Sequence, residues 1–280
     1  MRVGHMFLLT VFLSLWLVCQ ARAGLDEAVA AYEKGAYSEA FKEFKVLADQ
    51  GNAQAQLHLG VMYDLGQGVP PSQTEAMKWY LKAAEQDFDR AELALGLKYA
   101  GGIGIPPDYL KAVKWYRRAA EHGIAEAQCD LGLLYSLGKG VTQDKAEAVK
   151  WYRRAAEQGY AMGQCNLGLM YARGDGVPQD FAEAVKWFRK AAAKGYVKAQ
   201  YNLGVAYEKG DGVPKDFESA YMWFQLAAAK DDSDAKSRID VIAPQMTPPQ
   251  IAEAQRLAKE WKPSDLDRED TLPAHRFIGD

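Results

Sequence analysis

The sequence predicts an all-α fold, a right-handed solenoid (superhelix) of stacked αα-hairpins. Three kinds of residue carry this prediction, because tryptophan, glycine and tyrosine each recur with a spacing of 36 residues. Such a period is typical of helical repeat proteins, in which each unit buries its apolar face against its neighbours. The three columns are Trp79, Trp115, Trp151, Trp187 and Trp223; Gly60, Gly96, Gly132, Gly168 and Gly204; and Tyr63, Tyr99, Tyr135, Tyr171 and Tyr207.

Within one unit, residues 127–135 are predicted to form the first helix. Ala127, Leu131 and Tyr135 recur at every fourth position and make a buried stripe. Gly132 lies beside this stripe, and a glycine inside a helix costs stability, so we expect it to allow close approach of the second helix. Glycines at 138 and 140 then end the first helix, since glycine tolerates positive φ.

The second helix of the same unit begins at Asp144. This residue is placed to cap the helix, and Glu147 three positions later is placed to return the bond. Asp180 with Glu183 and Ser72 with Glu75 repeat this pair in two other units. The apolar face of the helix is expected to comprise Ala148, Trp151, Tyr152, Ala155 and Ala156.

The repeated residues form the pattern A-x-A-Q-x-x-L-G-x-x-Y-x-x-G-x-G-V-x-x-D-x-x-E-A-V-K-W-Y-x-x-A-A-E-x-G. This pattern resembles the Sel1-like repeat, a relative of the tetratricopeptide repeat. The resemblance covers residues 52–231 in five copies. It implies a scaffold that binds other proteins, so we expect a protein or peptide partner.

The flanks of the repeats predict four further segments. Residues 1–23 have a basic start, an apolar run and an Ala21-Arg22-Ala23 cleavage site, the layout of a secretory signal peptide. Residues 24–51 read as a capping hairpin with a shorter, tetratricopeptide-like turn, and residues 232–261 as C-terminal capping helices. The polar segment 262–280 is expected to be flexible. Location in the periplasm of a Gram-negative bacterium, or secretion, follows from the leader.

Charge narrows the class of partner. Removal of Arg2 and Arg22 from the 34 basic residues, against 37 acidic ones, leaves a net charge of about −5. This charge disfavours nucleic acid as the main partner. Beyond the leader, no apolar run is long enough for a membrane span. We expect a monomer.

The sequence predicts no catalytic residue, metal site or cofactor. His58, His122 and His275 fall in unrelated columns, and no nucleophile signature is present. Cys129 and Cys165 share a column, where packed helices lie about 8–10 Å apart, too far for a disulfide. By family analogy the alternative function is a hydrolase that binds β-lactams or cell-wall fragments, as in cysteine-rich Sel1-like proteins. Those proteins carry paired cysteines within each repeat, which this chain lacks.

The first helices are expected to line a concave groove, as in tetratricopeptide proteins. Columns that vary among units are candidates for specificity, and the uniform Val/Leu column is favoured as half-buried packing. Together they fit an extended peptide or an amphipathic helix. The predicted partner-binding residues are Gln54, Leu57, Arg90, Leu93, Leu97, Glu126, Leu133, Met162, Leu169, Lys198 and Tyr201.

The second helices carry a ladder of basic residues. A solvated convex face with weak ion pairs to nearby glutamates is the favoured interpretation. A patch for an anionic ligand such as a cell-envelope polymer is the alternative. The ladder consists of Lys114, Arg117, Arg118, Lys150, Arg153, Arg154, Lys186, Arg189 and Lys190.

Overall fold

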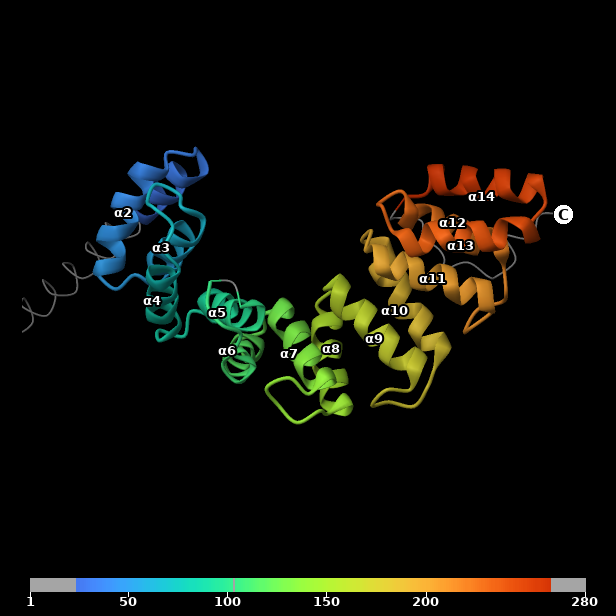
Figure 1. Ribbon diagram of the computed structural model, residues 1–280, viewed down its shortest axis with the longest axis horizontal. Helices are drawn as coiled ribbons and strands as arrows, with labels where there is room; N and C mark the ends of the chain where they lie inside the picture. Colours follow the sequence, from blue (N-terminus) through green and yellow to red (C-terminus); the bar gives the residue numbers. More distant parts are fainter. Residues whose placement is uncertain (1–23, 103, 263–280) are drawn as a thin grey trace, which may run out of the picture. The chain divides into compact units, whose positions relative to one another are not determined.

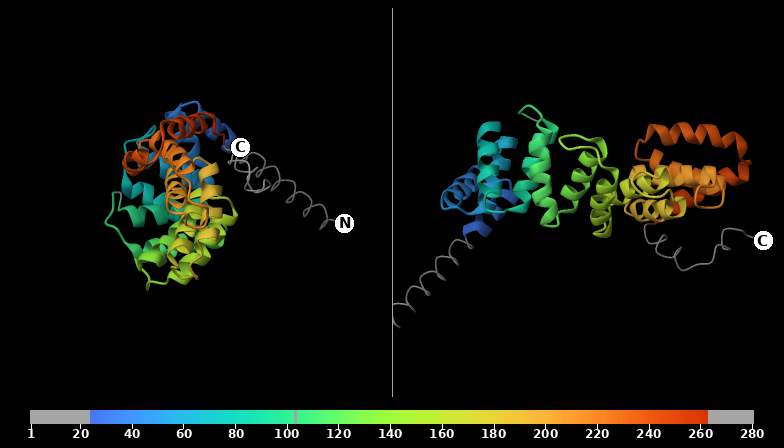
Figure 2. Two further views of the ribbon diagram at one scale, coloured as in Figure 1. Left: turned by 90° about the vertical axis from the view of Figure 1, so that its right-hand side faces the viewer. Right: turned by 90° about the horizontal axis from the view of Figure 1, so that it is seen from below.

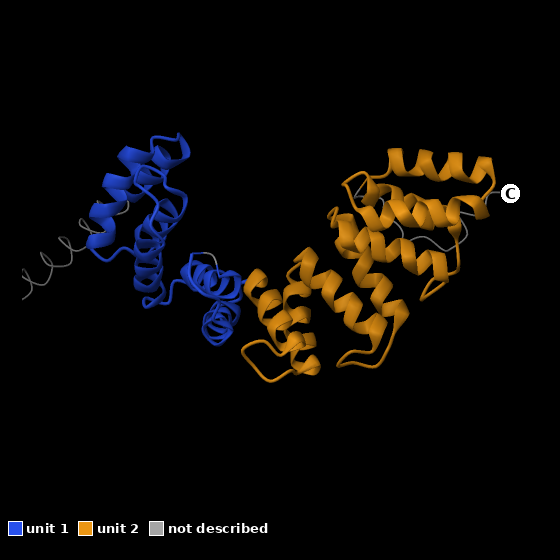
Figure 3. Cartoon of the chain, viewed as in Figure 1, with its two compact units in different colours: residues 1–124 blue, residues 125–280 orange. Residues whose placement is uncertain are grey.

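A computed structural model describes residues 24–102 and 104–262, and within these ranges every regular element is a helix. The predicted all-α repeat solenoid is thereby confirmed. The chain divides into two compact units, residues 1–124 and 125–280 (Figure 3). The predicted signal peptide and residues 263–280 of the predicted tail lie outside the described residues.

Unit 1 is a succession of antiparallel helices (Figure 1). It begins with a helix over residues 24–33, in the segment expected to form a capping hairpin, and Ala28 of this helix is buried in one core with Phe44 of the next helix. Neighbouring helices along the chain pack against each other throughout the unit. The remaining helices are α2 (Tyr37–Asp49), α3 (Ala53–Leu65), α4 (Gln73–Ala84), α5 (Asp89–Gly101) and α6 (Tyr109–Glu121).

Unit 2 continues the same alternation of first and second helices. Its first helices are α7 (Ala125–Leu137), α9 (Ala161–Arg173), α11 (Val197–Lys209) and α13 (Ser233–Ile242). Its second helices are α8 (Lys145–Glu157), α10 (Phe181–Ala193) and α12 (Phe217–Ala228). A short 3₁₀ turn, η1 (Ala243–Gln245), then leads to α14 (Pro248–Glu260).

The predicted caps begin the second helices. Asp144 Oδ1 accepts a hydrogen bond from the backbone N–H of Glu147 at 2.9 Å, and Asp180 accepts one from Glu183 at 2.9 Å. The Glu147 carboxylate, expected to return the bond, contacts Lys150 Nζ at 2.7 Å. At Asp144, therefore, the structure shows the hydrogen bond that the cap residue accepts but not the returning one. At Thr247, which begins α14, both hydrogen bonds of a capping box are present.

Glycine ends the first helices and lets the second helices approach them. Gly66, Gly174 and Gly210 are left-handed caps with φ between 69° and 82°, a conformation that side chains with a Cβ disfavour. Gly204, inside α11, lies against the ring of Phe224 in α12. The close approach expected at this glycine column is confirmed.

The hydrophobic cores that precede the last one each include the tryptophan of the next hairpin. In unit 1, the core of α4 and α5 includes Leu95 and is completed by Trp115 from α6. In unit 2, the core of α8 and α9 includes Leu167 and is completed by Trp187 from α10. The alanine columns are fully buried in these contacts. Tyr135, expected within the buried stripe, is only half-buried at the edge of the same core.

The last helix seals the C-terminal end of unit 2. Helix α14 lies along α12 in the views of Figure 1 and Figure 2 and packs against it. Ala254 of α14 is fully buried in the last core with Ile242, and Trp261 packs edge-on against Trp223 at 5.7 Å between ring centroids. Helices α13 and α14 lie in the segment 232–261, for which C-terminal capping helices are expected.

Candidate functional site

The predicted partner-binding residues of unit 1 lie on α3 and α5. Gln54 and Arg90, at the start of the two helices, are exposed. Leu97 is 43% exposed, which is high for a leucine on a packed helix. Leu57 and Leu93 are half-buried. The unit therefore offers one polar and one apolar exposed position on α5, with partly covered leucines between them.

The predicted residues of unit 2 lie on α7, α9 and α11. Met162 and Lys198 are exposed, and Leu133 is 41% exposed. Glu126, Leu169 and Tyr201 are half-buried. The three helices are directly joined, because Asn166 of α9 contacts Cys129 of α7 and Asn202 of α11 contacts Cys165 of α9.

The Val/Leu column, favoured as half-buried packing, behaves in two ways. Val61, Leu169 and Val205 are half-buried and pack against hydrophobic cores, as expected. Leu97 and Leu133 instead remain substantially exposed. Exposed apolar side chains gain free energy when a partner covers them, about 25 cal/mol per Å² of apolar surface. These two leucines are therefore the stronger candidates for contact with a partner.

Two exposed leucines were not among the predicted residues. Leu65 at the end of α3 is 64% exposed, and Leu137 at the end of α7 is 52% exposed. Leu137 follows Leu133 by one helical turn, so the two lie on the same face of α7. Both stand five residues after a glycine of the glycine column, at a position that varies among the repeats. A leucine at such a variable position is the signal that could have identified them.

Part of the variable surface is used internally. Asp64 is in the column four residues after the glycines, and its carboxylate contacts Lys98 Nζ at 2.6 Å and accepts a hydrogen bond from Tyr80 Oη at 2.8 Å. In the same column of unit 2, Glu208 contacts Arg238 at 3.2 Å. Variation at these two positions reflects ion pairs between neighbouring first helices, so they are weaker candidates for a binding role.

The two cysteines of the repeats are unsuited to nucleophilic chemistry. Cys129 and Cys165 are free thiols, each 1% exposed. Burial raises the pKa of the Cys129 thiol to about 12 and that of the Cys165 thiol to about 11. Because the thiolate is the reactive form, these thiols are inert at neutral pH. The prediction that they do not form a disulfide is confirmed.

The two described histidines have structural partners. His58 stacks on Phe44 with ring centroids 4.5 Å apart, and burial, followed by Arg90, lowers the pKa of His58. His122 contacts the carboxylate of Glu92. His275 lies outside the described residues. Among residues 24–102 and 104–262, no cluster of three or more His, Cys, Asp or Glu residues could hold a metal ion.

The basic ladder of the second helices engages neighbouring groups. Lys186 contacts Glu183 at 3.1 Å, in the same way as Lys150 contacts Glu147. Arg154 and Lys190 lie 4.5 Å above the ring centroids of Trp151 and Trp187, close enough for cation–π attraction. The ladder therefore has the ion pairs of the favoured interpretation, together with stacking on the tryptophan column.

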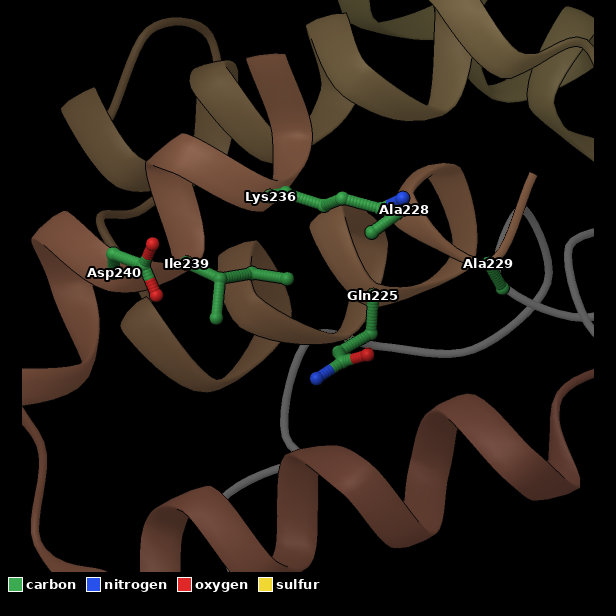
Figure 4. A pocket seen from close by; sticks show the side chains of 6 residues that line it. All are labelled: Gln225, Ala228, Ala229, Lys236, Ile239 and Asp240. Atoms are coloured by element: carbon green, nitrogen blue, oxygen red, sulfur yellow. The ribbon is translucent and has the colours of Figure 1, made fainter. Parts of the chain in front are cut away.

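A hollow of about 330 Å³ lies between α12 and α13 (Figure 4). Its lining contains neither a thiol nor an imidazole, and Lys236 is paired with Asp231 at 3.0 Å. The lining residues are Gln225, Ala228, Ala229, Lys236, Ile239 and Asp240.

Fold and surface together define a helical repeat protein of the interaction-scaffold class. A model of the Sel1 repeat matches residues 53–88, 89–124, 125–160, 161–196 and 197–232, so the chain belongs to the Sel1 repeat family. These segments agree with the predicted repeats to one residue. Within the described residues, no helix is long and apolar enough to cross a membrane.

Solved structures of other proteins resemble this chain to different degrees. A Sel1 repeat protein from Oxalobacter formigenes is 35% identical, with a TM-score of 0.75 over 85% of this chain and 97% of that one. A protective antigen with this fold from uropathogenic Escherichia coli is 35% identical over 82% of this chain and 58% of that one, with a TM-score of 0.46. Cysteine-rich protein B of Helicobacter pylori is 24% identical over 45% of this chain and 95% of that one, with a TM-score of 0.37. No curated protein matches the sequence.

Proposed function

We propose that the chain is an exported interaction scaffold that binds a peptide or an amphipathic helix of a partner protein on its first helices. One observation carries the proposal. The tryptophan and glycine columns are buried and uniform, whereas the column of Gln54, Arg90, Glu126, Met162 and Lys198 differs in every repeat and lies at least partly exposed. Residues that the architecture leaves free to vary are the ones that can select a partner.

The chemistry of the surface supports a peptide or helix as the ligand. Apolar side chains at Leu133 and Leu137 are exposed on one face of α7, and the exposed charge of Lys198 lies on α11 of the same unit. Helices bound in grooves place apolar anchors on such leucines, and charged edges select among sequences.

Site-specific cross-linking tests the binding face. A photoreactive residue is placed at Leu133 or Lys198, on the first helices. The comparison places it at Lys150 on a second helix, where the native lysine side chain is 70% exposed. We expect the same partner protein to be captured in the cell envelope from both first-helix positions and not from Lys150. Capture of that partner equally from all three positions would contradict a first-helix binding face.

Export is part of the proposal and has a separate test. The basic start, apolar run and Ala21-Arg22-Ala23 site support cleavage after Ala23. We expect the mature protein to begin at Gly24 and to fractionate with the periplasm or the medium. An uncleaved chain in the cytosol would refute export without bearing on the binding face.

A further inference from the structure

Glu92, in the first turn of α5, is a fully buried carboxylate held by two side chains of α6. Its Oε1 lies 2.8 Å from Nε of Arg118, and its Oε2 lies 3.1 Å from Nδ1 of His122. Arg118 also donates hydrogen bonds to the Ala84 carbonyl oxygen at 3.0 Å and to Asp87 at 2.6 Å. This cluster, which we call the Glu92 cluster, joins the end of α4, the start of α5 and the end of α6.

The first and third repeats build the same joint from neutral side chains, whereas the fourth and fifth carry Lys194 and Lys230 at the position of His122. Gln56 and Gln128 occupy the position of Glu92, and Gln86 and Gln158 occupy that of His122. Gln86 donates to Gln56 at 2.8 Å, and Gln158 donates to Gln128 at 2.7 Å. The chain has thus replaced a pair of amides by a pair of ionisable groups at one joint.

A third substitution belongs to the same cluster. Asp87 stands where the following repeats have Gly123 and Gly159, and it keeps their left-handed conformation with φ of 58°. This conformation costs less in glycine than in aspartate. Its carboxylate contacts Arg118, so a residue that is less favourable for the turn brings a second acid to the cluster.

The charges of the cluster do not balance while His122 is neutral. Glu92 and Asp87 each carry a negative charge, and Arg118 carries one positive charge. The charged or titratable groups that act on Glu92 are Asp87, Arg118 of α6, and His122 at the C-cap of α6. One added proton would neutralise the cluster, and His122, with 41% of its side chain exposed, gives that proton access from solvent.

We propose that the Glu92 cluster is a pH-sensitive joint that takes up a proton as the pH falls below neutral and then holds α6 more firmly to α5. The contact between Glu92 and His122 can be kept with the added proton on either residue. A protonated imidazole donates to the carboxylate, and a protonated carboxyl group donates to the neutral imidazole. This inference goes beyond partner binding and does not depend on it.

The direction of the pH effect on stability follows from the burial of Glu92. Desolvation raises the pKa of Glu92, and the positive charge of Arg118 offsets only part of this effect. A carboxyl group whose pKa is raised by folding stabilises the folded state at acid pH, and this contribution is lost as the pH rises through the raised pKa. The joint should therefore be weaker at neutral pH than in mild acid.

Hydrogen exchange of the full chain tests the joint. The wild type is compared with the double variant Glu92→Gln/His122→Gln, which installs the amide pair of the first and third repeats. Both proteins are measured at about pH 7.5 and about pH 5.5, which lie above the ordinary pKa of an exposed glutamate. After correction for intrinsic rates, we expect the protection of α5 and α6 to rise at the lower pH by a factor of about three to ten more in the wild type.

The chain supplies an internal reference, because α7 and α8 carry the natural pair Gln128 and Gln158. In the double variant, α5 and α6 should respond to pH no more than α7 and α8 do. Equal pH responses of wild type and variant at α5 and α6 would overturn the proposal.

A second measurement needs no variant to fold. Carboxyl NMR of the wild type with labelled glutamate should show one buried glutamate that titrates at a higher pH than the exposed ones. If every glutamate titrates together in the ordinary range, the proposal fails.

Discussion

Gly204 and Phe224 are in direct contact, with the ring of Phe224 in α12 lying across the backbone of α11. A Cβ atom added at Gly204 would lie 2.6 Å from Cε1 of Phe224, a separation that real carbon atoms do not adopt. Phe224 is fully buried, so its ring has little room to move aside. The glycine column thus sets how closely the two helices of a hairpin pack.

Replacement of Gly204 by alanine is expected to destabilise the protein. Alanine favours the helix by about 1 kcal/mol over glycine, but overpacking a buried ring costs about 1–3 kcal/mol, so the net change should be a loss. Gly132→Ala is the matched control, because its added Cβ would lie 3.0 Å from the ring of Tyr152 and should be tolerated better. Urea unfolding measures both, and a larger loss for Gly132→Ala would contradict the argument.

Removal of the cap at Asp144 should weaken α8. Asp144→Ala removes the acceptor of the Glu147 N–H, a change that costs about 1 kcal/mol in comparable helices. Lys150→Ala, which breaks an ion pair with a 70%-exposed lysine, should cost less than about 0.5 kcal/mol. Thermal unfolding monitored by circular dichroism compares the two variants. Equal losses would mean that the cap contributes no more than the surface pair.

Two leucines on α7 separate stability from binding. Leu131 is fully buried, and Leu131→Ala should cost about 2–5 kcal/mol of unfolding free energy. Leu133 is 41% exposed, and Leu133→Ala should change stability by less than about 0.5 kcal/mol. If Leu133 contacts the partner, its truncation should nevertheless weaken binding, as measured by calorimetry with the captured partner. Normal affinity of the Leu133 variant would place the contact elsewhere.

The native thiols should resist modification. Burial and the raised pKa values of Cys129 and Cys165 predict little reaction with an aromatic disulfide reagent at about pH 8 until the chain is unfolded. Leu137→Cys, at a position 52% exposed, is the positive control for the reagent. Mass spectrometry of the labelled peptides identifies each site. Rapid labelling of native Cys129 or Cys165 would show that the thiols are accessible, and would renew interest in turnover of a chromogenic β-lactam.

Reversal of charge should change affinity on one face only. Lys198→Glu on α11 is expected to weaken the partner complex about tenfold, or about 1.4 kcal/mol, if Lys198 contacts an acidic residue of the partner. Lys150→Glu on α8 should leave the affinity unchanged. Titration of the partner at two salt concentrations checks this, because the effect of Lys198 should shrink in high salt.

The repeat made the architecture predictable, because every copy reports the same packing requirement. The caps at Asp144 and Asp180, the close glycines and the terminal helices could all be assigned from spacing and residue chemistry. The predicted first helix at 127–135 is shorter than α7, which runs from Ala125 to Leu137. Terminal turns carry no buried stripe, so periodicity could not mark them.

The candidate surface was less predictable because exposure depends on neighbouring helices. Leu97 and Leu169 occupy the same column, yet Leu97 is exposed and Leu169 packs on a core. Likewise, Asp64 and Glu208 lie in a variable column, yet they are paired with Lys98 and Arg238 of neighbouring first helices. The Glu92 cluster was also missed, since a buried carboxylate is recognised by what surrounds it and not by its place in a repeat.

The tryptophan that closes each core belongs to the hairpin that follows it. A chain cut between hairpins would therefore end on an open core, with Tyr80 uncovered where Leu95 and Trp115 are lost, or Tyr152 uncovered where Leu167 and Trp187 are lost. Gene duplication that copies whole repeats preserves this tryptophan contact on each side of the added repeat, whereas insertions of other lengths do not. The fold can thus be lengthened only by complete repeats. Each added repeat brings a further variable, exposed position on its first helix.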